Sequence, residues 1–354
     1  MSERERVALV FGGRSGEHEV SLRSAASVAA GLAERHEVLC VLVDKAGRWL
    51  LQPDGPQPSG GEPVFLAASP ADRGRLRRLA DARSLAEPDI YFPLVHGTHG
   101  EDGTLQGLLE LAAVPYVGAG VAASAVSMDK AMMKALFARA GLPQVDYRVL
   151  RARDRSAAPR LAGEMGLPLF VKPAGLGSSV AVSKVRSPGE LDAALDAAFA
   201  YDEKVVLEQG TDAREIEVSI LGDEDPEASV PGEIVPDREF YDYDSKYSPD
   251  SRTELRIPAP VSPELTERVR ELGLRAFSAV DAAGYARVDM FLERGTGRLL
   301  VNEINTIPGF TSISMYPKLW EASGVGYPEL LARLVALARE RHARRARRRT
   351  DYGR

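Results

Sequence analysis

The chain has 354 residues, enough for two or three domains, and its apolar, charged and glycine fractions are those of an ordinary globular protein. The formal net charge of −6 argues against a protein whose main partner is nucleic acid. Cys40 is the only cysteine, which excludes an internal disulfide, and we find neither a signal peptide nor a run long enough to cross a bilayer, so we expect a cytoplasmic protein without nucleic-acid or membrane partners.

The first third of the chain has the pattern of an α/β domain. We predict a strand over 6–11, a glycine-rich turn over 12–16, a helix over 19–33 and a second strand over 37–44. A strand, a glycine-rich turn and a helix in this order are typical of phosphate-binding sites. The spacing is not G-x-G-x-x-G, however, which argues against a dinucleotide site. Residues 45–80 are weakly patterned, and no element is predicted there.

Two polar stretches of this first domain could bind a ligand. Glu17 lies at the start of the first helix, where the helix dipole alone favours an acid, or where the acid could orient a cationic substrate group. A third strand, 89–95, ends in a turn over 96–103 that contains two histidines, three glycines and two acids. Such a turn suits a ligand crevice or the N-terminus of the helix over 104–112. The histidines lack metal-ligand spacing, which disfavours a metal site.

The middle of the chain carries lysines beside a loop of small residues. A helix over 129–140 contains Lys130 and Lys134, neither of which its chemistry alone would single out. A strand then leads to Lys172 and to the loop 173–179. This loop could fold over phosphates and donate backbone N–H groups, with the lysine as a point charge, or it could be a flexible hairpin. It is not a Walker A loop, because no G-x-x-x-x-G-K-[ST] occurs.

Acidic residues follow on the next two strands. Glu208 ends a strand over 205–210, and Glu215 begins an alternating strand over 214–221. Both could hold the amine and ribose hydroxyls of an adenosine. A solvated sheet face is the alternative, and we expect it for Glu217.

A polar and aromatic segment, YDYDSKYSPDSR, occupies residues 241–252. We predict a lid loop that carries Lys246 and Tyr247, with a surface loop as the alternative. A helix over 263–282 follows.

Two apolar strands on either side of the turn 294–297 are predicted to form a β-hairpin. A turn centred near residue 296 places Asp289 opposite Glu303 and Arg287 opposite Asn305, although a one-residue bulge would spoil this register. Residues two apart in a strand share a face, so these four side chains converge. Carboxylate and amide oxygens in such a group suit Mg²⁺. The alternative is a solvated face with a cross-strand ion pair.

The chain ends in an amphipathic helix that starts at Tyr327 and runs into an arginine-rich block over 341–349. Such a block could contact nucleic acid or an anionic surface, but a solvated tail is the favoured interpretation.

Taken together, these stretches resemble the D-alanine–D-alanine ligases of the ATP-grasp superfamily. The resemblance covers nearly the whole chain and rests on ordered motifs: GGRSGEHEVS, HGTHGEDGTLQG, MDK, VKPAGLGSSV, LEQG with REIEV, YDYDSKY, and RVDMF with NEINTIPGFTSIS. Each motif is weak alone, but the ordered set is specific.

The resemblance implies an α/β fold in three parts: an N-terminal Rossmann-like domain over 1–120, a central ATP-grasp lobe over 121–205, and a C-terminal ATP-grasp lobe over 206–354 that includes the lid. It implies that D-alanyl-D-alanine is made for peptidoglycan from two D-alanines and ATP through an acyl phosphate. The implied cofactors are ATP and two Mg²⁺ ions, which Mn²⁺ could replace. A homodimer is also suggested.

The resemblance assigns roles to individual residues. The ATP phosphates are assigned to Lys130, Lys172 and Lys246. The adenosine is assigned to Glu208 and Glu215. The Mg²⁺ ions are assigned to Asp289, Glu303 and Asn305. Arg287 and the Gly309 N–H are assigned to the oxyanion. Glu17, together with Ser178 and Tyr247, is assigned to the first D-alanine. Ser314 is assigned to the second D-alanine.

Three rival functions fit parts of the sequence. The first is an enzyme of the same fold that joins D-alanine to D-lactate or to another D-acid. Tyr247 argues against D-lactate, because the related resistance ligases commonly carry histidine at the lid position. The second rival is a binding protein that has lost catalysis, and it conflicts with the complete set of candidate ligands. The third is a dinucleotide-dependent oxidoreductase, and it conflicts with the glycine spacing.

Overall fold

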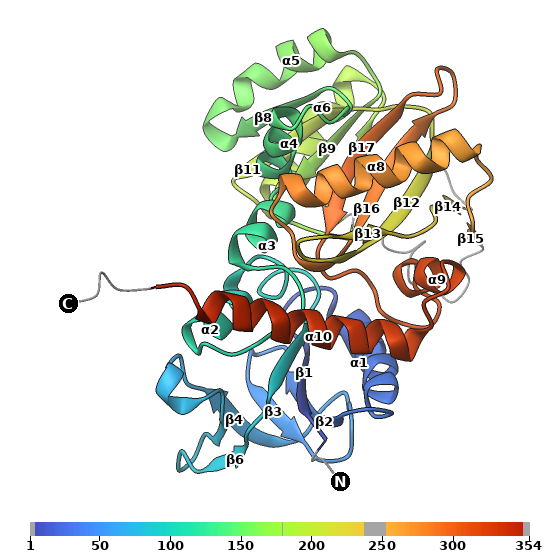
Figure 1. Ribbon diagram of the computed structural model, residues 1–354. Helices are drawn as coiled ribbons and strands as arrows, with labels where there is room; N and C mark the ends of the chain where they lie inside the picture. Colours follow the sequence, from blue (N-terminus) through green and yellow to red (C-terminus); the bar gives the residue numbers. More distant parts are fainter. Residues whose placement is uncertain (1–3, 179, 237–252, 350–354) are drawn as a thin grey trace.

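The computed structural model describes residues 4–178, 180–236 and 253–349 (Figure 1). Within these residues the strands form three sheets that follow one another along the chain, and helices pack beside each. This mixed architecture confirms the predicted α/β fold class. The predicted lid over 241–252, with Lys246 and Tyr247, lies outside the described residues.

The first sheet has the strand order β6-β5-β4-β3-β2-β1-β7, in which β2, β1 and β7 are parallel and the other neighbours antiparallel. Its strands are β1 (Arg6–Gly12), β2 (Glu37–Val43), β3 (Trp49–Gln52), β4 (Glu62–Leu66), β5 (Leu76–Arg78), β6 (Ser84–Ala86) and β7 (Ile90–Leu94). Three of them, β3 to β5, lie in the segment where no element was predicted.

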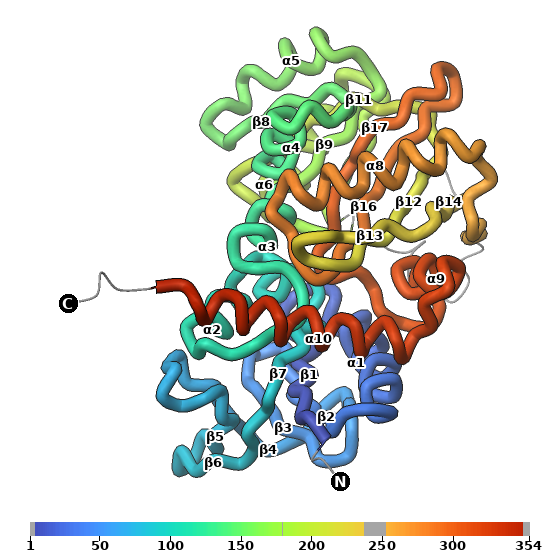
Figure 2. The backbone as a smooth tube through the Cα atoms, viewed as in Figure 1, coloured from blue at the N-terminus to red at the C-terminus, as the bar shows by residue number. Residues whose placement is uncertain are grey.

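The two faces of this sheet pack into different cores. Alternate residues of β1 point to opposite faces, so Leu9 and Phe11 join one cluster while Ala8 and Val10 join another. The first cluster is closed by α1 (His18–Leu32) and the C-terminal helix α10 (Tyr327–Ala346), and the second by α2 (Thr104–Leu111). Figure 2 shows α10 passing beside α1. The end of the chain is therefore packed on its beginning.

The second sheet has the order β10-β9-β11-β8, and every neighbouring pair is antiparallel. Its strands are β8 (Tyr147–Arg151), β9 (Leu169–Pro173), β10 (Ser183–Val185) and β11 (Lys204–Gln209). The helices before and around it are α3 (Val121–Met128), α4 (Lys130–Arg139), α5 (Ala158–Met165) and α6 (Leu191–Phe199). Short 3-10 turns lie at Pro70–Asp72, Ala152–Ala157 and Pro188–Glu190. One core joins α5 and α6 to this sheet.

The third sheet has the order β15-β14-β12-β16-β17, with β13 paired to β12. Its strands are β12 (Ala213–Gly222), β13 (Glu227–Ala228), β14 (Gly232–Val235), β15 (Glu254–Arg256), β16 (Gly284–Glu293) and β17 (Leu299–Asn305). The helices α8 (Pro263–Ala279) and α9 (Met315–Ala322) pack against it. Val218, Val288 and Val301 point into the core that α8 covers. The opposite face of the third sheet carries Glu215, Glu217 and Asp289, which line a cleft.

The arginine-rich end of α10 differs from the predicted solvated tail. The Arg341 guanidinium donates to the carbonyls of Tyr116 and Gly118 and lies 4.8 Å from the centre of the Tyr116 ring. Arg344 Nη2 lies 2.7 Å from Asp223 Oδ2. These arginines thus hold the C-terminal helix to the first domain and to the turn after β12. Among the described residues, none of the helices has the length and apolar character needed to cross a membrane.

Candidate active site

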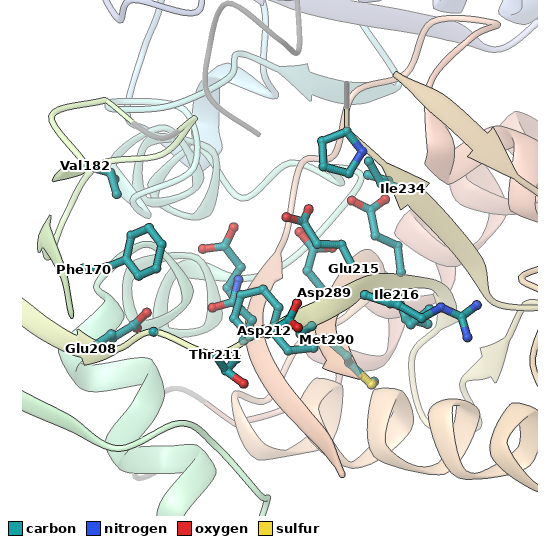
Figure 3. Close-up of a pocket in the computed structure, with 18 of the residues that line it drawn as sticks. Phe170, Val182, Glu208, Thr211, Asp212, Glu215, Ile216, Ile234, Asp289 and Met290 are labelled. Carbon is teal, nitrogen blue, oxygen red and sulfur yellow. The ribbon is translucent and has the colours of Figure 1, made fainter. Parts of the chain in front are cut away.

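A cleft of about 680 Å³ lies between the second and third sheets. Figure 3 shows Phe170, Val182 and Glu208 on one side of it, and Glu215, Ile234 and Asp289 on the other. A concave space of this size, with both polar and apolar walls, is typical of a small-molecule site.

The hairpin β16–β17 supplies one wall of the cleft, and its predicted register is confirmed. Asp289 is opposite Glu303, and Arg287 is opposite Asn305. The position of the turn and the regularity of the pairing differ from the prediction. Near the turn, Leu292 pairs with Leu299, so the turn is centred half a residue earlier than expected. A bulge at Asn302, between the partners of Asp289 and Met290, adds the missing residue and restores the register.

Arg287 is held by two carboxylates at the face of this hairpin. Its Nε and Nη2 lie 2.6 and 2.7 Å from the two oxygens of Asp289, and its Nε lies 3.1 Å from Glu217 Oε2. Burial acts to lower the pKa of the guanidinium, but Asp289 and Glu217 outweigh it and raise that pKa. The expectation of a solvated Glu217 was wrong, since its side chain is 6% exposed. The register of β12 on β16, which sets Glu217 opposite Asp289, could not be deduced from the sequence alone.

The predicted metal ligands are brought to one end of the hairpin. Asp289 and Glu303 are cross-strand neighbours, and the Glu303 side chain is 33% exposed. Asn305 Oδ1 accepts a 3.0 Å hydrogen bond from the Ile307 N–H, which orients the amide. In the described part of the chain, no three His, Cys, Asp or Glu side chains cluster as a metal site. Two carboxylates and one amide nevertheless form an oxygen donor set that fits Mg²⁺, which keeps several waters and shares substrate oxygens.

The opposite wall of the cleft carries a cluster of buried charges around Glu208. Lys172 Nζ contacts Glu208 Oε2, and Lys134 Nζ lies 2.8 Å from Glu208 Oε1. Burial acts to raise the pKa of Glu208, but the two lysines outweigh it and lower the pKa to about 2. The sequence did not single out Lys134, although its i, i+4 spacing from Lys130 places both on one face of α4.

Lys130 connects the two walls. Its Nζ donates a 2.6 Å hydrogen bond to the Leu176 carbonyl and lies 3.9 Å from Glu303 Oε2. Burial lowers the pKa of its ammonium, and Glu303 opposes this effect. The loop after β9, in which Leu176 lies, is thereby tied to the start of α4. Glu215 lines the same cleft from β12, where it is opposite Phe291.

The first domain reaches the same loop through Glu17. Its carboxylate accepts a hydrogen bond from the Ser178 hydroxyl, and no side-chain hydrogen bond from Glu17 caps α1. The helix dipole is therefore not the whole reason for an acid at this position. Near the end of β17, Ser314 Oγ accepts from the Thr311 N–H at 3.0 Å and lies 3.0 Å from where a Cβ on Gly309 would stand. Gly309 and Ser314 thus lie side by side.

His96 lies in the turn for which the sequence suggested a ligand crevice or a helix N-terminus and disfavoured a metal site, and the structure gives this side chain partners in two distant segments. Its Nδ1 lies 2.9 Å from the Ile307 carbonyl, and its Nε2 lies 3.1 Å from Ser24 Oγ. Its side chain is buried, and Ser24 Oγ also accepts from the Phe310 N–H at 3.4 Å. The first domain thus holds the segment 306–310 that follows the hairpin.

Comparison with known proteins covers both halves of the chain. The family model described as "D-ala D-ala ligase N-terminus" matches residues 6–119, and "D-ala D-ala ligase C-terminus" matches residues 136–336. A protein of Heliobacterium modesticaldum named D-alanine–D-alanine ligase is 49% identical over 98% of both chains.

Solved structures agree with this result. The D-alanine–D-alanine ligase of Coxiella burnetii is 37% identical, with a TM-score of 0.84 over 98% of this chain and 97% of that one. The VanG D-Ala:D-Ser ligase of Enterococcus faecalis is 31% identical, with a TM-score of 0.86 over 95% of this chain and 100% of that one.

Proposed function

The chain belongs to the D-alanine–D-alanine ligase family and joins two D-alanines with the use of ATP, and we propose that the cleft between the second and third sheets is where this reaction takes place. The observation that carries the proposal is the convergence of Arg287, Asp289 and Glu303 on one face of the hairpin, opposite the lysines of the other wall. Phosphoryl transfer depends mainly on positioning and charge stabilisation, which such a set can supply.

We assign the ATP phosphates to Lys130, Lys172 and Lys246, and the adenosine to Glu208 and Glu215. Lys172 contacts Glu208, so to reach the phosphates it would have to turn away from this carboxylate. Two Mg²⁺ ions, held by Asp289, Glu303 and Asn305, would neutralise the phosphate oxygens when bound.

Arg287 and the Gly309 N–H are assigned to the oxyanion that forms when the second amine attacks the acyl phosphate. Both Nε and Nη2 of Arg287 donate to Asp289, which fixes the plane of the guanidinium. Glu17, linked to Ser178, would bind the first ammonium together with Tyr247. Ser314 would bind the carboxylate of the second D-alanine.

We further propose three domains, with boundaries after residue 120 and near residue 205. Because β11 extends to Gln209 within the second sheet, the second boundary is better placed just after that residue. We also propose a homodimer in the cytoplasm.

The reaction is tested by phosphate release from ATP and Mg²⁺ with D-alanine, L-alanine, or D-alanine plus D-lactate or D-serine, with the products identified by mass. We expect release that requires D-alanine and yields D-alanyl-D-alanine. A mixed product formed in preference to it would move the second subsite toward another D-acid. No release with any of these substrates, from folded protein that binds ATP, would refute the proposal.

The metal assignment is tested with Glu303→Gln rather than with Asp289→Asn. Asp289 is the bidentate partner of Arg287, and the two side chains are only 16% and 17% exposed, so replacing Asp289 would also break part of this ion pair and destabilise the protein. Glu303→Gln should abolish turnover at ordinary Mg²⁺ and leave the melting temperature unchanged, as should be found for the exposed control Glu321→Gln. Near-normal turnover in Glu303→Gln would defeat the assignment.

A further inference from the structure

Lys134 is a buried cation that the proposed mechanism does not use. It lies one helical turn after Lys130 on α4, and its side chain is 1% exposed. Its Nζ lies 2.8 Å from Glu208 Oε1 and 5.6 Å from the centre of the Tyr147 ring. Burying a lysine is costly unless it is paired, so a role for this pair deserves a physical explanation.

Glu208 faces more positive charge than it needs for neutrality. Three lysines surround it: Lys130 and Lys134 from α4, and Lys172 from β9. The neighbouring strand β8 adds an aromatic ring, that of Tyr147, which is opposite Glu208. Lys172 holds Oε2 and lines the cleft, and our assignment moves it to the phosphates when ATP binds. Lys134 contacts the other oxygen, Oε1. It would therefore remain with Glu208 after Lys172 has moved.

We propose that Lys134 is a positioning residue for base recognition: it holds Glu208 as an ionised hydrogen-bond acceptor, with Oε2 turned to the cleft, and so favours a 6-amino purine over a 6-keto purine. The inference rests on the proposed assignment of Glu208 to the adenosine.

The chemical argument concerns donors and acceptors. An ionised carboxylate only accepts hydrogen bonds, so it pairs with the exocyclic amine of adenine and repels the carbonyl oxygen of hypoxanthine. A buried carboxyl that loses its cation tends to bind a proton. The protonated group can donate to a carbonyl oxygen, so the preference between the two bases should shrink or reverse.

The test compares kcat/KM for ATP and ITP in Lys134→Met. We expect the ATP-to-ITP ratio to fall about 10- to 100-fold, the usual range for a hydrogen bond to a charged group. The loss should appear mainly in KM for ATP. This loss should grow as the pH is lowered from about 9 to about 6, whereas the ratio in the unaltered enzyme should stay constant. A merely structural role for Lys134 would not give a pH-dependent base preference.

Arg139→Met is the matched control, because it removes one exposed positive charge from the same helix. Lys134→Gln is the second variant, used if Lys134→Met fails to fold, since it keeps a donor without the charge. In a Glu208→Gln background, Lys134→Met should change the ratio no further.

An unchanged ATP-to-ITP ratio in either folded Lys134 variant would overturn the inference. So would an equal loss of preference in Arg139→Met. Failure of the proposed function is recognised separately, because the unaltered protein would then show no D-alanine-dependent phosphate release with ATP.

Discussion

Replacement of Arg341 by methionine tests whether the arginine-rich end of α10 stabilises the fold. The guanidinium donates to two backbone carbonyls, those of Tyr116 and Gly118, and stacks on the Tyr116 ring at 4.8 Å. Both residues are buried. Methionine keeps much of the aliphatic length but leaves both carbonyls without this donor.

The size of the effect follows from these contacts. A buried polar group that loses its partner costs about 1–3 kcal/mol, and a cation–π contact contributes about 0.5–2 kcal/mol. Arg341 is partly exposed, so water can reach part of the site, and we take the lower half of each range. For two carbonyls and one cation–π contact, Arg341→Met should therefore lower the free energy of unfolding by roughly 2.5–5 kcal/mol.

The measurement is urea unfolding followed by the fluorescence of Trp49 and Trp320, together with calorimetry, because a multidomain chain need not unfold in one step. Arg348→Met, in the exposed end of the tail, is the control and should leave the midpoint unchanged. Equal midpoints for Arg341→Met and Arg348→Met would show that water replaces the guanidinium, and would refute the reasoning.

Two further predictions concern the site. The pKa of Glu208 is held at about 2, below its ordinary 4.5, so its ionised form stabilises the protein above pH 4.5, and this contribution is lost as pH falls toward 2. Urea unfolding at several pH values should give a steeper loss between these limits for the unaltered protein than for Glu208→Gln. Gly309→Ala places a Cβ 3.0 Å from Ser314 Oγ, so it should lower turnover about tenfold or more without weakening ATP binding. Gly295→Ala, with open space around the added Cβ, should behave as the unaltered enzyme in the same phosphate-release and ATP-titration assays.

The hairpin was predicted from sequence because its signals are local. Apolar alternation and a turn are enough to pair Asp289 with Glu303, since the period of a strand is two. Even so, the agreement depended on a bulge at Asn302 that compensated for a turn centred half a residue earlier. The local pattern therefore predicted which residues pair, but not the position of the turn or the bulge at Asn302.

The missed features are those that depend on distant parts of the chain. The strands β3 to β5 have only three to five residues, too few for a clear period. The charge of Lys134 predicted solvent exposure, and only the packing of α4 against β11 explains its burial. The arginines of α10 likewise resembled a solvated block until their partners more than two hundred residues away were known.

The same long-range contacts explain why the first domain belongs to the site although most of the cleft lies elsewhere. The hairpin fixes Arg287 and Asp289, but it does not fix the segment 306–310 that follows it. That segment is held by His96, whose Nδ1 lies 2.9 Å from the Ile307 carbonyl, and by Ser24, which accepts from the Phe310 N–H. Because Gly309 lies between these two contacts, its backbone position is set by residues of the first domain. The proposed oxyanion site at Gly309 therefore depends on the first domain as well as on the two sheets that line the cleft.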